Sequence, residues 1–253
     1  MFKLLGIGNS FSDDAFEWVY PMLESLKIEN KAVNNLYIGG CSLDMHLRNM
    51  KEDLPAYEYR RFERRISSSN FKISEALKID DWQYITMQQS SYDSGMKESY
   101  AVLGELLDLV KKSKPSGAKL YWHMTWAYSK DSTHPAFVNY GNDQLKMYNA
   151  IVDCVKSEVL KFDDFVGVIP SGTAIQNART SSLGDNLDRD GFHLSYDLGR
   201  YIAGLCVVCT ILGVDPESIP FTPHGVDPLR KKIAIESVRN ALKNPFGITN
   251  SLL

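Results

Sequence analysis

The stretch FKLLGIGNS, residues 2–10, decides the fold class of this chain. Residues 2–7 form a short apolar run of the kind found in a buried strand, and a Gly-Asn-Ser tight turn follows it. Residues 14–26 then place apolar side chains at helical spacing, and we expect Pro21 to kink this helix or to delay its regular part. A strand, a tight turn and a helix in this order predict an α/β protein.

The rest of the chain repeats this order of elements. Further strands are predicted at residues 32–38, 82–87, 119–125 and 165–169, and further helices at 43–47, 97–112, 143–159, 198–212 and 228–242. Residues 57–74 are polar and alternating, which is compatible with an antiparallel excursion. Five strands separated by helices predict a parallel, doubly wound sheet, and without a repeat or linker we expect residues 1–253 to form a single domain. Ligands bind beyond the carboxyl ends of the strands in such sheets.

Composition and charge exclude several classes of protein. The chain has 28 basic and 31 acidic residues, a formal charge of −3, so no global positive field favours nucleic acid or an anionic membrane as a partner. The longest strongly apolar stretch, residues 201–214, is shorter than the roughly 20 residues of a membrane span. Four cysteines are too few for a disulfide scaffold. The N-terminal sequence lacks an apolar signal region followed by a cleavage site, and the compartment stays open.

Two sequence features suggest nucleophilic catalysis. Ser10 lies in the turn after the first strand, close to the start of a helix, where a developing negative charge is stabilised. Asp190 precedes His193 by three residues, so its carboxylate can fold back and hold the imidazole in the tautomer that a general base needs. Each feature also has an ordinary structural interpretation, a helix N-cap for Ser10 and a surface loop for the Asp-x-x-His sequence.

Acyl transfer also needs hydrogen-bond donors directed at the oxyanion. The candidates are the backbone N–H groups of Ser10 and Gly40 and the side-chain amide of Gln89 or Gln88, all at predicted strand ends. A simple glycine turn and surface glutamines would explain these residues separately. Their arrival at one edge of one sheet favours the catalytic interpretation.

Longer strings carry a family resemblance. IGNSFSDDA, YIGGCSL, WQYITMQQSS, HMTWAY, IPSGTAIQNAR and RDGFHLS resemble a bacterial branch of the SGNH (GDSL-type) hydrolase superfamily. The resemblance implies a three-layer α/β/α sandwich of flavodoxin-like type with a central five-stranded parallel sheet. It also implies hydrolysis of an ester through an acyl-serine intermediate, often the deacetylation of a carbohydrate, with no cofactor and no metal. The expected partner is therefore a small-molecule or carbohydrate ester.

The resemblance also assigns roles to residues. Ser10 would be the nucleophile, His193 the base and Asp190 its orienting carboxylate, with Gly40 as one oxyanion donor. Where the superfamily has a Gly-x-Asn-Asp block, this chain has QQSS at residues 88–91, so the third donor is at best a glutamine. Gln89 is the expected third donor, with Gln88 or Ser90 as the alternatives.

Candidate substrate contacts lie at the same strand ends. Aromatic faces suit sugar rings, although aromatic residues are equally common in buried cores. An Arg after the fifth strand suits a polar ligand or a surface ion pair. The expected substrate-binding residues are Asn9, Gln88, Trp122, His123, Trp126, Tyr128 and Arg179.

Two further interpretations compete with the esterase. Residues 186–197, with Asn186, Asp188, Asp190 and Asp197, resemble a calcium-binding loop that would stabilise a binding domain, but Asp190 cannot easily serve both this loop and the triad. A non-catalytic carbohydrate-binding protein on the same fold is the other alternative. The Cys206-x-x-Cys209 pair lies in an apolar helical run without a second pair, so buried thiols are expected there.

Overall fold

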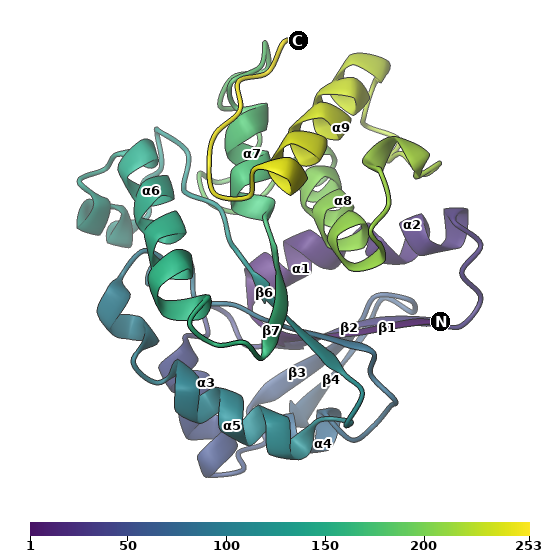
Figure 1. Ribbon diagram of the computed structural model, residues 1–253, viewed down its shortest axis with the longest axis vertical. Coiled ribbons are helices and arrows are strands. Elements are labelled where there is room, and N and C mark those ends of the chain that lie inside the picture. The colour runs from purple at the N-terminus through teal and green to yellow at the C-terminus, as the bar shows by residue number, and fades with distance from the viewer.

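A single mixed sheet forms the centre of the computed structural model, which describes residues 1–253. Its seven strands are arranged in the order β4-β3-β2-β1-β5-β6-β7 (Figure 1). The strands are β1 (Phe2–Gly8), β2 (Lys31–Tyr37), β3 (Tyr57–Arg61), β4 (Ile66–Phe71), β5 (Tyr84–Met87), β6 (Lys119–His123) and β7 (Phe165–Ile169). The five predicted strands pair in parallel, and β3 and β4 extend the sheet as an antiparallel hairpin. The predicted count of five strands was therefore wrong, because the hairpin adds two, but the antiparallel excursion considered for residues 57–74 is confirmed at this place.

Helices cover both faces of the sheet. They are α1 (Ser10–Phe16), α2 (Val19–Ser25), α3 (Leu43–Lys51), α4 (Ile73–Ala76), α5 (Leu103–Ser113), α6 (Gln144–Cys154), α7 (Ser171–Ala178), α8 (Leu198–Leu212) and α9 (Pro228–Lys243). A π-helical turn at Val155–Val159 extends α6, and short 3₁₀ turns lie at Lys97–Tyr100, Pro135–Tyr140 and Pro216–Ser218. Helices α1, α2, α7, α8 and α9 gather on one side of the sheet, and α3, α4 and α5 gather on the other (Figure 1).

The first helix differs from the single element predicted for residues 14–26. The chain forms α1, breaks at residues 17–18 and starts again as α2. Pro21 falls in the first turn of α2, where its missing N–H costs nothing. A continuous helix would instead press the proline ring against the carbonyl of Glu17, so the break lies where the proline requires it.

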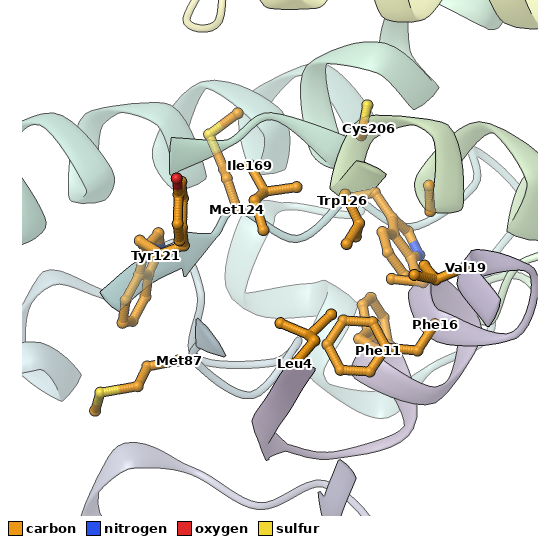
Figure 2. Close-up of a cluster of buried hydrophobic side chains, with 14 of the residues drawn as sticks. Leu4, Phe11, Phe16, Val19, Met87, Tyr121, Met124, Trp126, Ile169 and Cys206 are labelled. Atoms are coloured by element: carbon orange, nitrogen blue, oxygen red, sulfur yellow. The ribbon is translucent and has the colours of Figure 1, made fainter. Parts of the chain in front are cut away.

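A continuous apolar core connects the sheet to its helices. Figure 2 shows Phe11 and Phe16 of α1 among buried side chains from β1, β6 and α8. The rings of Phe11 and Trp126 stack with centroids 4.3 Å apart. Helix α8 is buried on nearly all sides, as expected for residues 198–212. None of the helices combines the length and apolar character needed to cross a bilayer.

Candidate active site

The turn between β1 and α1 places Ser10 at the carboxyl edge of the sheet. Asn9 caps α1, because its Oδ1 accepts a hydrogen bond from the N–H of Phe11 at 3.0 Å. Its Nδ2 donates to the carbonyl of Cys41 at 3.1 Å, which ties this turn to the segment after β2. A Cβ at Gly8 would lie 1.9 Å from Ser12 Oγ, so only glycine fits before the turn. Ser10 is left half-buried at the first position of the helix.

The loop before α8 brings a histidine to this serine from 183 residues further along the chain. His193 Nε2 lies 2.9 Å from Ser10 Oγ, and His193 Nδ1 lies 2.7 Å from Asp190 Oδ2. Asp190 Oδ1 also accepts the backbone N–H groups of Phe192 and His193. Burial raises the pKa of the Asp190 carboxyl, but these hydrogen bonds outweigh it, so the pKa is lowered and the group is ionised. Gly191 turns the loop with φ +88°.

A buried carboxylate holds α1 against this loop. Asp14, one turn after Ser10, is completely buried. Its Oδ2 accepts the backbone N–H of Leu194 at 2.8 Å, and Arg189 Nη1 donates to both of its oxygens at 3.0 and 3.1 Å. Arg200 of α8 donates from Nε to Oδ1 at 2.8 Å. Asp14 therefore fixes α1 relative to the residues on either side of the Asp190–His193 segment.

Gly40, after β2, lies at the same edge with an unpaired backbone N–H. This N–H makes no hydrogen bond within the protein, and the φ of +63° favours glycine at this position. The Tyr92 hydroxyl donates to the Gly40 carbonyl at 3.0 Å and so fixes the peptide. As the first residue of α1, Ser10 has an N–H without an intrahelical partner. The backbone N–H groups of Ser10 and Gly40 are therefore both without a partner within the protein.

The structure does not bring the predicted third donor, Gln89, to this position. Its Nε2 donates to the carbonyl and hydroxyl of Ser99 at 3.1 and 2.9 Å. Its Oε1 accepts the N–H groups of Leu43 and Ser90 at 3.0 and 2.8 Å. Gln89 thus uses both ends of its amide to join the start of α3 to the segment after β5. The alternative Ser90 is fully buried, and its hydroxyl donates to Asp93.

Gln88 connects the Ser10 turn to the end of β6. Its Nε2 donates to Asn9 Oδ1 at 2.7 Å, and its Oε1 accepts the Ser12 hydroxyl at 2.7 Å and lies 2.9 Å from His123 Nδ1. His123 Nε2 lies 3.0 Å from Ser171 Oγ. Burial lowers the pKa of His123 to about 3, so the imidazole stays neutral. Asn9, Gln88 and His123, predicted as substrate contacts, instead form a buried network under the site.

The predicted aromatic sugar platform lies in the core. Trp122, Trp126 and Tyr128 are each at most 1% exposed, and a buried ring has no face for a ligand. Trp126 Nε1 donates to the carbonyl of Phe192 at 2.8 Å, so it supports the histidine loop from below. The half-buried aromatic residues of the rim are Tyr92 and Phe192, which the sequence analysis did not single out. Tyr92 follows the WQYITMQQSS string, and Phe192 lies within RDGFHLS between the two residues, Asp190 and His193, that received a role.

Arg179, predicted as a substrate contact, is also buried and pairs with carboxylates of the protein. Its side chain is 3% exposed, and it pairs with Asp188 and Asp185, each at 2.7 Å. Burial raises the pKa of Asp188 to about 6, against the lowering effect of Arg179. This pairing anchors the residues that lead into Asp190.

The calcium-loop interpretation is not supported by the arrangement of its side chains. Asp188 binds Arg179, Asp190 binds His193, and Asp197 caps α8. No group of three or more His, Cys, Asp or Glu side chains is arranged to hold a metal ion. Cys206 and Cys209 are buried free thiols within α8.

A polar cavity of about 480 Å³ adjoins the loop that carries Asp190 and His193. None of its lining residues is hydrophobic, and they are Ser129, Asp131, Thr133, Asp185, Asn186, Asp188, Arg189, Asp190 and Gly191.

Comparisons with known proteins place the chain in a family. A family model described as "Domain of unknown function (DUF4886)" matches residues 3–241. The crystal structure of a DUF4886 family protein from Bacteroides uniformis is similar to this chain, with a TM-score of 0.94 and 38% identity over 98% of this chain and 97% of that chain. No curated protein matches the sequence.

More distant solved structures share the fold. A member of the lipolytic protein G-D-S-L family from Veillonella parvula has a TM-score of 0.54 and 13% identity, over 85% of this chain and 100% of that chain. A catalytic mutant of an acetylxylan esterase from Geobacillus stearothermophilus has a TM-score of 0.51 and 14% identity, over 83% of this chain and 94% of that chain. Because the family model spans nearly all of the sequence, the protein belongs to the DUF4886 family.

Proposed function

We propose that the protein is a serine esterase of the SGNH type, acting as a single domain, with Ser10 as nucleophile. The observation that carries this proposal is the continuous hydrogen-bonded chain from Asp190 through His193 to Ser10 Oγ. A serine hydroxyl is a weak nucleophile alone and needs a neutral imidazole within hydrogen-bond reach. The 2.9 Å separation supplies that reach, and the ionised Asp190 holds the imidazole by Nδ1, so Nε2 can accept the proton.

The mechanism follows from the positions of these groups. His193 takes the Ser10 proton as Oγ attacks the ester carbonyl, and the resulting oxyanion accepts the N–H groups of Ser10 and Gly40. His193 then returns the proton to the leaving alkoxide, which departs as the alcohol. Water, activated by the same imidazole, attacks the acyl-serine and releases the carboxylic acid and free Ser10.

For the substrate, we propose an O-acetyl group on a carbohydrate. The polar cavity beside Asp190 supports this choice, because hydroxyl groups of a sugar can pair with its carboxylate and hydroxyl side chains. Fold similarity to an acetylxylan esterase is compatible with it at the level of analogy. The buried tryptophans do not contribute, so sugar recognition would rest on the rim and on this cavity.

The test compares wild type with Ser10→Ala and with Ser116→Ala, which alters an exposed serine that makes no side-chain hydrogen bond. We expect Ser10→Ala to lower the turnover of phenyl acetate at least about 10³-fold and to abolish covalent labelling by a fluorophosphonate. Ser116→Ala should match wild type in both measurements. Equal turnover by Ser10→Ala and wild type would remove Ser10 from the mechanism. A wild-type protein that binds carbohydrate but neither hydrolyses esters nor reacts with the probe would be the non-catalytic alternative.

A further inference from the structure

His134 lies at the rim of the candidate site, in the segment that follows β6. Its ring centroid is 4.8 Å from that of Phe192 in an edge-on arrangement, and the Phe192 ring is 4.1 Å from the His193 ring. The Tyr128 ring packs 4.7 Å away on the interior side. The segment is held against the triad loop, because the Ser129 N–H donates to the Gly191 carbonyl at 2.9 Å. Only one aromatic ring therefore separates this second imidazole from His193.

The hydrogen bonds of His134 define which nitrogen carries its proton. Nδ1 accepts the backbone N–H of Ala136 at 3.2 Å, so the proton of the neutral ring lies on Nε2. Burial lowers the pKa of His134, which favours the neutral ring. Nε2 makes no hydrogen bond within the protein, yet it is not a buried atom. His134 therefore presents one oriented and unused N–H donor at the rim.

The reaction geometry indicates which part of a substrate this donor faces. The oxyanion must lie at the N–H groups of Ser10 and Gly40, while the leaving oxygen must lie near His193 Nε2 to receive its proton. The His134 ring packs against Phe192, which in turn packs against His193, so His134 lies on the same side of the site as His193. The donor therefore adjoins the alcohol portion of an ester rather than its acyl group.

We propose that His134 donates a hydrogen bond from Nε2 to a second oxygen on the substrate alcohol, close to the scissile ester. The inference rests on the proposed esterase function and narrows its substrate class. A simple alkyl or aryl ester has no such oxygen. A sugar or another polyol carries one on the neighbouring carbon, so His134 would select esters of polyhydroxy alcohols.

Two substitutions at His134 separate this role from packing. His134→Phe keeps a ring between Tyr128 and Phe192 but removes the donor, and His134→Asn keeps an acceptor for the Ala136 N–H but withdraws the donor from the rim. His224→Phe, at an exposed histidine, is the matched control. Steady-state kinetics are measured with an acetylated methyl glucoside and with phenyl acetate, whose alcohol carries no second oxygen.

We expect both His134 variants to lower kcat/KM for the sugar acetate about tenfold, the effect of one lost hydrogen bond, with less than a twofold change for phenyl acetate. The His224→Phe variant should match wild type on both esters. Equal losses on both esters, or no loss on the sugar acetate, would overturn the assignment of His134. Failure of wild type to cleave either ester would instead refute the esterase itself, so the two failures are distinguishable.

Discussion

Replacing Asp14 by alanine tests whether the carboxylate under α1 holds the Asp190–His193 loop in place. The side chain is 1% exposed and accepts donors from Arg189, Arg200 and the Leu194 backbone. Removing one partner of a buried charged pair costs about 3–5 kcal/mol. The arginine side chains here are 23% and 15% exposed, so water relieves part of their loss and the lower end, about 3 kcal/mol, applies. At about 2–4 °C per kcal/mol for a chain of this size, Tm should fall by about 6–12 °C.

The same substitution should reduce activity below the melting range. Without Asp14, the Leu194 N–H next to His193 loses its acceptor, and a displacement of about 1 Å between base and nucleophile can cost about 10²-fold in rate. The assays are thermal unfolding and phenyl acetate turnover at 20 °C. Asp108→Ala is the control, because its pair with Lys111 spans 3.8 Å and its side chain is 67% exposed. If Asp14→Ala melts and turns over substrate like Asp108→Ala, the reasoning about this buried carboxylate is refuted.

Two other substitutions test the network and the packing around the site. In the folded protein, burial lowers the pKa of His123 to about 3, whereas the pKa of an unfolded histidine is about 6.5. Between these values only the unfolded state binds the proton, so the free energy of unfolding falls as the pH drops below about 6.5. Between pH 7.5 and pH 5 the protonation of unfolded His123 lowers the free energy of unfolding by about 2 kcal/mol, and His123→Gln should abolish this contribution. Identical pH dependence of urea unfolding in the variant and in wild type would contradict this prediction. At Gly172, a Cβ would lie 2.1 Å from the carbonyl oxygen of Thr125, so Gly172→Ala should destabilise the fold by about 3 kcal/mol in chemical denaturation. Gly117→Ala, with no atom within 4 Å of the added Cβ, should change it by less than about 0.5 kcal/mol, and similar values for the two variants would show that the backbone yields.

The sequence predicted the parallel part of the fold because its central strands, β1, β5 and β6, are buried along most of their length. Such strands appear as continuous apolar runs, as in β1, and runs of this kind separated by helices leave few topologies. The β3–β4 hairpin gave a weaker signal. Every residue of β4 is half-buried or exposed, so this strand has no apolar run, and its polar alternation indicated an antiparallel excursion without fixing two strands.

In the candidate site, too, some contacts depend on residues that are close in sequence and others on residues that are far apart. Asp190 and His193 are three residues apart, so a single turn can bring the carboxylate to Nδ1. The spacing alone also suits a surface loop, and the position of the pair after the last strand favoured the contact. The approach of Ser10 to His193 depends on the parallel topology, which places the turn after β1 beside the loop before α8. Topology was predictable, so the residues of this contact could be named from the sequence.

Neither the spacing in sequence nor the topology of the sheet determines the hydrogen-bond partners of Gln89. A glutamine side chain has three rotatable bonds and carries both donors and an acceptor, so its position at a strand end does not determine its partners. Here the N–H of the buried Leu43 donates to Gln89 Oε1, and burying that N–H unpaired would cost about 1–3 kcal/mol. This demand arises from the start of α3, which is distant in sequence from Gln89. The buried Gln89 amide therefore pairs with groups inside the protein, and in the proposed mechanism the oxyanion donors are the backbone N–H groups of Ser10 and Gly40.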